Sequence, residues 1–193
     1  IDQYNLSVSS DQIYANFAYL QTVCISSYIP RLTLRGTSVS KDLGCGGYRL
    51  GWATFPDELT WLFDICNYMA SSIYSCATVP IQYATANMLE NGSLIKKVCD
   101  DTKKIFSNVA SEICECIENS NCKGKIRYVY PQAAWYLFLN FDKYKDKLVE
   151  NNINSSISLQ MFLLNTYGIV TVAGTHFNVS GLNLRFSLVD IIN

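Results

Sequence analysis

Apolar residues recur along this chain with two different periods, and the period changes several times. The longest pattern lies between positions 93 and 119, where apolar residues repeat mostly every three or four positions along one face. They are Leu94, Val98, Ile105, Val109, Ile113 and Ile117. This spacing is typical of an amphipathic helix, and it predicts one helix of roughly 40 Å because each residue adds about 1.5 Å.

Shorter patterns predict the other elements. Helical spacing recurs at 59–69 after Pro56, at about 80–90, and at 157–167. Strand-like runs occupy 6–10, 31–38, 126–130, 135–141, 169–173 and 182–189. The run 31–38 lacks strict alternation, so we expect both of its faces to be covered. The second half of the chain reads as an α+β lobe distinct from the first half.

Composition narrows the class of protein. The chain has 193 residues, 49% of them hydrophobic, and a net charge of −1. It can bury a real core, but it carries no excess of positive charge for phosphate backbones or acidic membranes. We therefore expect a globular protein with no nucleic-acid and no membrane partner. The chain starts at Ile1 rather than Met, which suggests a piece of a longer protein.

Eight cysteines allow either four disulfides or eight reduced thiols. Most lie among apolar residues in helical stretches, where a free cysteine behaves as a small hydrophobe, so we favour a reduced, cytoplasmic protein. A zinc site at Cys114, Cys116 and Cys122 is the alternative. This group contains no C-x-x-C pair and no nearby fourth ligand, so we expect no metal site.

Candidate chemistry gathers around a glycine-rich segment. Five of the ten glycines fall between positions 36 and 51, as in a loop whose backbone passes close to another group. Lys41 follows the predicted strand 31–38, with Ser38 and Ser40 before it and Arg49 eight residues after it. This set suits a Schiff-base lysine beside a phosphate. The alternative is a surface lysine beside a flexible loop.

Three motifs occur in a fixed order along the chain. They are Ser10-Asp11-Gln12-Ile13-Tyr14, then Ser38-Val39-Ser40-Lys41 with Gly47-Tyr48-Arg49-Leu50-Gly51, and finally Ala173-Gly174-Thr175-His176-Phe177 with Leu182-Asn183-Leu184-Arg185-Phe186-Ser187. Together they resemble the C-terminal half of the fold-type I pyridoxal-phosphate aminotransferases, the class I/II family of aspartate and tyrosine aminotransferase-like enzymes. Gln12 stands where that family often has Glu.

The resemblance implies an α/β fold, namely the C-terminal part of the pyridoxal-phosphate-dependent transferase (aspartate aminotransferase-like) fold. Residues 1–92 would form part of the large cofactor-binding domain with a partial sheet. Residues 93–120 would be a long inter-domain helix, and 121–193 a small α+β domain. The family's chains are about twice as long, so the N-terminal half would be missing, and the intact protein would be a homodimer.

The resemblance also implies roles for residues of the first half. Lys41 would form a Schiff base with pyridoxal 5'-phosphate and then carry the proton between substrate and cofactor. Asp11 would pair with the protonated pyridine nitrogen, and Tyr14 would donate to the phenolic oxygen. Ser38 and Arg49 would hold the phosphate. The alternatives are that Asp11 only caps a turn and that Tyr14 is a core aromatic.

Arg185 lies in a strand whose even positions, 182 to 188, are apolar, so Asn183, Arg185 and Ser187 share the other face. That face is either ordinary solvent-exposed surface or a substrate cleft. The resemblance favours the cleft, with Arg185 binding the substrate α-carboxylate as a bidentate fork.

The implied function is transfer of an amino group between an α-amino acid and a 2-oxo acid in the parent enzyme, of which this chain would be an incomplete part. Two alternatives remain: a lyase of the same superfamily, or a folded fragment that has no catalytic role and serves as an interaction module.

Overall fold

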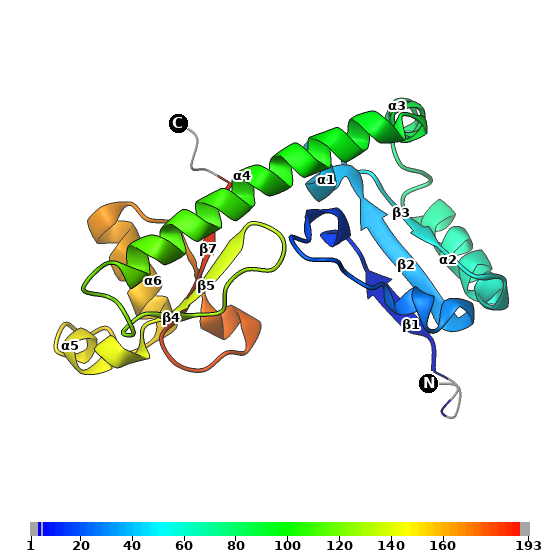
Figure 1. Ribbon diagram of the computed structural model, residues 1–193. Coiled ribbons are helices and arrows are strands. Elements are labelled where there is room, and N and C mark those ends of the chain that lie inside the picture. The colour runs from blue at the N-terminus through cyan, green and yellow to red at the C-terminus, as the bar shows by residue number, and fades with distance from the viewer. Residues whose placement is uncertain (1–3, 5, 190–193) are drawn as a thin grey trace. The chain divides into compact units, whose positions relative to one another are not determined.

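The computed structural model describes residue 4 and residues 6–189, and the chain divides into two compact units, residues 1–103 and 104–193. The division falls inside the longest helix, α4 (Gly92–Glu118), which confirms the long helix predicted from sequence. Domain boundaries at 92/93 and 120/121 stay a prediction. Figure 1 labels most of the helices and strands of both units. In the described part of the chain, no helix is both long enough and apolar enough to cross a bilayer.

Unit 1 contains a small sheet with strand order β1-β2-β3 (Figure 1). β1 and β2 are parallel, and β3 is antiparallel to β2. The strands are β1 (Val8–Asp11), β2 (Thr33–Ser38) and β3 (Gly51–Thr54). The helices wholly within this unit are α1 (Val39–Asp42), α2 (Thr60–Ile73) and α3 (Val79–Glu90). Neither β3 nor α1 was expected from the sequence pattern.

The core of unit 1 is small. Its buried apolar side chains include Phe17, Val39, Leu50 and Leu59. The expectation that β2 is covered on both faces is wrong for the described residues, because only Thr33 of its six residues is buried. The helix α2 has the predicted apolar spacing but no buried residue. Its exposed large side chains are Trp61, Phe63, Ile65, Tyr68, Met69 and Ile73.

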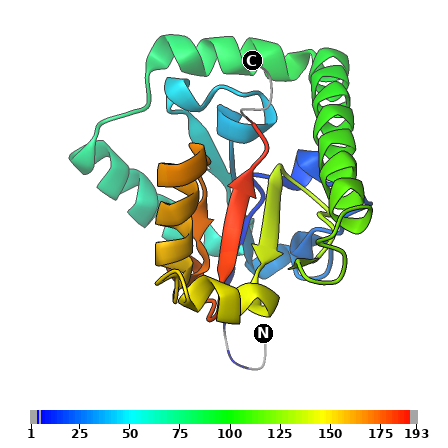
Figure 2. The same ribbon diagram turned by 90° about the vertical axis from the view of Figure 1, so that its left-hand side faces the viewer.

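Unit 2 is a four-stranded antiparallel sheet in the order β4-β5-β7-β6. Its strands are β4 (Arg127–Tyr128), β5 (Tyr136–Asn140), β6 (Val172–Ala173) and β7 (Asn183–Ser187), and its further helices are α5 (Lys145–Val149) and α6 (Ser156–Tyr167). Helix α6 packs beside β6 and β7 (Figure 2). A capping box of Ser155 and Ser158 starts α6, and Gly168 ends it in the left-handed conformation.

Alternation along the strands builds the core of unit 2. Leu137 and Leu139 of β5 are buried while their neighbours are only half-buried. Leu184 of β7 is fully buried and packs with Ile153, Leu159 and Leu182. The strands predicted at 135–141 and 182–189 are therefore confirmed with shorter bounds.

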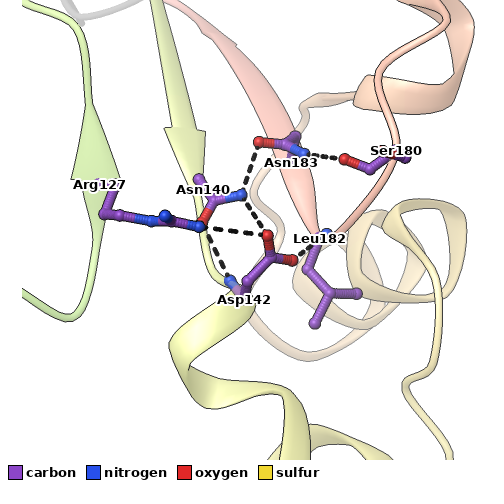
Figure 3. A network of polar contacts seen from close by, with 6 residues as sticks. All are labelled: Arg127, Asn140, Asp142, Ser180, Leu182 and Asn183. Carbon is purple, nitrogen blue, oxygen red and sulfur yellow. Dashed lines mark hydrogen bonds and ion pairs between the residues drawn. The ribbon is translucent and has the colours of Figure 1, made fainter.

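A polar network joins the ends of β4, β5 and β7 (Figure 3). Asp142 accepts hydrogen bonds from the backbone N–H of Leu182 at 2.7 Å and from Asn140 Nδ2 at 2.7 Å. Asn140 Nδ2 also donates to Asn183 Oδ1 at 2.9 Å, and Arg127 Nη2 donates to Asn140 Oδ1 at 2.8 Å. Because each group already has a partner, the network fixes one register of β7 against β5.

Gly181 makes room for the Asp142 carboxylate. Its φ of +90° lies where L side chains are rare, and a Cβ there would stand 2.8 Å from Asp142 Oδ1. The turn into β7 thus needs both the glycine and the carboxylate that caps the Leu182 amide.

Asp142 should make the stability of unit 2 sensitive to acid. The Leu182 amide and Asn140 lower the pKa of Asp142, so its stabilisation is present above the unfolded-state pKa of about 3.9 and is lost as pH falls further. We expect D142A to lower the free energy of unfolding by about 1–3 kcal/mol at neutral pH. Amide exchange of residues 182–187 measures this loss.

The acid sensitivity has a matched control. The free energy of unfolding of the native chain should fall as the pH drops below about 4, and this acid-dependent fall should be absent in D142N. D146N, which changes an exposed residue of α5, should show the same fall as the native chain. Equal acid responses of the native chain and D142N would contradict the role of this carboxylate.

Candidate functional site

Parallel pairing places the ends of β1 and β2 at the same edge of the sheet in unit 1. Asp11, the last residue of β1, stands opposite Gly36 of β2, and Gln12 N donates to Gly36 O at 2.8 Å. Ser38 ends β2 two residues later. The carboxyl edge of parallel strands is where α/β proteins usually bind ligands, so Asp11 and Ser38 occupy the expected kind of place.

Lys41 lies in the short helix that leaves this edge. Ser38 caps α1, because its Oγ accepts a hydrogen bond from the backbone N–H of Ser40 at 3.1 Å. The cap turns the chain directly from strand to helix, and Lys41 is half-buried in that helix. Its Nζ lies 5.8 Å from the centre of the Tyr14 ring. The structure thus brings Lys41 and Tyr14 together from segments far apart in sequence.

Asp11 also shapes the turn that leads to Tyr14. Its Oδ1 accepts a hydrogen bond from Ile13 N at 3.1 Å, so it does cap the turn, as one of the two interpretations held. Asp11 and Tyr14 line a surface cavity of about 530 Å³ formed by segments 10–15 and 22–25. Lys41 and Ser38 are not among the residues that line this cavity.

Arg49 follows the glycine-rich loop. The loop folds back on α1 through a hydrogen bond from Cys45 N to Val39 O at 3.0 Å, and Ser38 pairs with Gly51. The backbone therefore returns beside Ser38 at this point. The exposed Arg49 guanidinium donates to Gly46 O of its own loop at 2.8 Å.

Asp42, the residue after Lys41, has a buried carboxyl group that the sequence pattern does not predict. Asp42 is 7% exposed, and Asn16 Nδ2 lies 2.5 Å from its Oδ2. The other oxygen, Oδ1, has no hydrogen-bond partner within the described residues. Burial raises the pKa of Asp42. This contact ties the segment that carries Tyr14 to the helix that carries Lys41, and no motif signals it.

Cys24 is a second residue without a sequence signal. It lines the cavity of Asp11 and Tyr14, and its Sγ accepts a hydrogen bond from Ser26 N at 3.4 Å. Hydrogen bonds from Ser26 lower the pKa of this thiol. Across the described residues, no three His, Cys, Asp or Glu side chains gather closely enough to hold a metal ion.

Arg185 belongs to unit 2, in β7. Its guanidinium carbon lies 4.4 Å from the centre of the Tyr136 ring and 4.7 Å from that of Phe177. Arg185 Nε is buried and meets no hydrogen-bond acceptor in the described chain. The face shared with Asn183 is not plain solvent-exposed surface, because Asn183 is 5% exposed and Arg185 is half-buried.

Comparison with known proteins shows one family. The family described as aminotransferase class I and II matches residues 1–191. A probable aspartate/prephenate aminotransferase of Aquifex aeolicus is 26% identical over 187 residues, covering 94% of this chain and 44% of the relative. A probable aspartate aminotransferase of Methanocaldococcus jannaschii is 24% identical, covering 96% and 46%. The chain spans about half the length of these curated relatives.

Solved structures show the same likeness. An aspartate aminotransferase double mutant of Thermus thermophilus superposes with a TM-score of 0.81 at 19% identity, over 97% of this chain and 45% of that one. An aromatic aminotransferase of Pyrococcus horikoshii has a TM-score of 0.81 at 21% identity, over 97% and 47%. Because the sequence identities are this low, the superpositions establish the fold alone. They confirm the predicted α/β class, and they confirm that this chain forms only part of that fold.

The buried Asp42 should cost stability at neutral pH. Because its pKa is raised, the folded state tolerates the neutral carboxyl best, and stability is lost as pH rises above the unfolded value of about 3.9. We expect D42N to unfold at a higher urea concentration than the native chain at pH 7 and at the same concentration near pH 3. D64N, on the exposed α2, is the control. A less stable D42N at pH 7 would disprove this account.

Proposed function

Because the chain belongs to the aminotransferase class I and II family, we propose that it is the C-terminal part of an enzyme that transfers an amino group between an α-amino acid and a 2-oxo acid. The observation that carries the proposal is the position of Lys41. It stands in the first turn after a parallel strand, with its amine 5.8 Å from the Tyr14 ring centre.

Proteins of this family use pyridoxal 5'-phosphate, and the polar groups of unit 1 fit that cofactor. An amine, a carboxylate, a phenol and a hydroxyl lie on Lys41, Asp11, Tyr14 and Ser38, all at or just after the carboxyl ends of β1 and β2. These groups match an aldehyde, a ring nitrogen, a phenolic oxygen and a phosphate. When bound, the cofactor supplies a cationic ring that accepts electrons from the substrate Cα.

Each residue has a role that its chemistry supports. The Lys41 amine holds the cofactor and moves the proton at the substrate Cα. The Asp11 carboxylate accepts a hydrogen bond from the ring N–H and keeps that nitrogen protonated. Tyr14 donates to the phenolic oxygen, and its contact with Lys41 keeps the amine near that oxygen. Ser38 and Arg49 bind the phosphate.

Arg185 binds the α-carboxylate of the substrate in this proposal. The N–H groups of a guanidinium normally donate hydrogen bonds to acceptors. The Nε of Arg185 is buried and has no hydrogen-bond partner among the described residues. An unpaired buried donor is costly, and a carboxylate in a bidentate arrangement would remove that cost. The buried donor therefore supports an anionic ligand at this position.

We further propose that a preceding N-terminal half covers the surface that unit 1 leaves open. The chain spans less than half of its curated relatives, and within the described residues β1 and β3 each pair on one side only. The chain exposes 13083 Å², against about 11,000 Å² for two separate compact bodies of half its mass. A homodimer of the intact enzyme, and the division into 1–92, 93–120 and 121–193, belong to the same proposal.

Labelling of Lys41 tests the cofactor role. Incubation with pyridoxal 5'-phosphate, reduction with borohydride and peptide mass spectrometry should mark Lys41 in preference to the other nine lysines. D11N should reduce this labelling because the ring nitrogen loses its partner, whereas D64N should leave it unchanged. Labelling spread evenly over the lysines would overturn the cofactor role of Lys41.

The coding region upstream of Ile1 tests the remaining part. We expect an in-frame segment with a Gly/Ser/Thr phosphate-binding turn, and the joined protein should convert an α-amino acid to a 2-oxo acid. An upstream stop codon together with unlabelled Lys41 would favour a folded fragment that has no catalytic role.

A further inference from the structure

Two aromatic rings flank the guanidinium of Arg185. Tyr136 of β5 and Phe177, at the end of the turn after β6, both lie within 5 Å of the Arg185 Cζ, at 4.4 and 4.7 Å from their ring centres. We call these two residues the aromatic clamp. A guanidinium this close to ring centres gains cation–π attraction on top of apolar contact.

Neither ring belongs to the fully buried core of unit 2, although the ring centre of Tyr136 lies 6.1 Å from that of Trp135 and the ring centre of Phe177 lies 6.1 Å from that of Phe138. Phe177 is 41% exposed and Tyr136 is half-buried, whereas the core of unit 2 is made of fully buried leucines on the same strands. A large ring left partly in solvent gains less from burial than a core residue does. What the two side chains share is their contact with Arg185.

The backbone holds both rings in place. Tyr136 pairs with Ser187 across the β5–β7 ladder, so it starts two residues from Arg185 along the neighbouring strand. Gly174 lets the turn that carries Phe177 approach β7, because a Cβ there would stand only 2.7 Å from Asn183 Cβ. The two residues of the clamp therefore come from the elements on either side of β7, namely β5 and the turn that follows β6.

We propose that Tyr136 and Phe177 are positioning residues that hold the Arg185 guanidinium in one orientation before a carboxylate arrives. An arginine side chain has many rotamers, and ordering it on binding weakens affinity. The rings fix those rotamers in advance and strip water from Nε, which leaves the donor ready for an anion. This inference rests on the proposed function, in which Arg185 binds a carboxylate.

NMR of the 193-residue chain tests the clamp directly. In the ligand-free chain, ring currents should shift the Arg185 Nε–H proton upfield and slow its exchange with water. F177L and Y136L should each move that signal toward the ordinary position. F162L is the matched control, because Phe162 is a half-buried ring of the same unit that packs on Tyr167. The Arg185 signal is assigned by its loss in R185K.

Titration with pyruvate measures the consequence for binding. We expect Y136L and F177L each to weaken pyruvate binding by roughly 5–10-fold, in line with the size of one cation–π contact. Y136F keeps the ring and should restore native affinity, which a loss of fold would not allow. R185K should abolish binding, since an ammonium cannot form the same planar fork.

Each result decides a different claim. Native affinity in Y136L and F177L, with binding lost in R185K, would overturn the clamp and leave the role of Arg185 standing. No pyruvate binding by the native chain, with a normally shifted Nε–H signal, would overturn the role of Arg185 and the clamp's function with it. Parallel losses in F162L would show a merely structural effect and would also overturn the clamp.

Discussion

Parallel pairing of β1 with β2 is the constraint on which the candidate site of unit 1 depends. Because the two strands run in the same direction, Asp11 and Ser38 reach the same edge of the sheet. The chain then turns twice at that edge, once through the Asp11 side chain and once through the Ser38 cap. These turns bring Tyr14 and Lys41 together. A shift of the β1–β2 register by one residue would separate Asp11 from Ser38 and Tyr14 from Lys41.

In unit 2, hydrogen bonds of polar side chains fix the positions of the strands and therefore the position of Arg185. Asp142 caps the amide that begins β7, and Asn140 and Asn183 join β5 to β7 (Figure 3). The register that follows sets Arg185 near Tyr136. The residues that fix the strands are therefore different from the residues that would meet a ligand, and loss of the former should affect binding only through the fold.

The positions of apolar residues along the sequence predicted the elements that depend on their own residues alone. The spacing of apolar residues predicted α4, a strand-like run predicted β5, and a strand-like run with alternating apolar positions predicted β7. These patterns missed β3, whose four residues Gly51–Thr54 are all exposed and carry no alternation. The expected covering of β2 on both faces was wrong, because burial depends on what covers a face and not on the spacing of its residues. The Asn16–Asp42 contact and the aromatic clamp left no sequence signal, since both arise from strand pairing and turns.

The central claim has two parts: Lys41 of unit 1 holds pyridoxal 5'-phosphate, and Arg185 of unit 2 binds a carboxylate. Crystallography of the longer protein with pyridoxal 5'-phosphate and a 2-oxo acid tests it most directly. We predict density for the cofactor joined to Lys41 Nζ, with the Asp11 carboxylate at its ring nitrogen and the substrate carboxylate on Arg185. Cofactor density elsewhere, or an Arg185 that contacts only protein groups, would contradict the account.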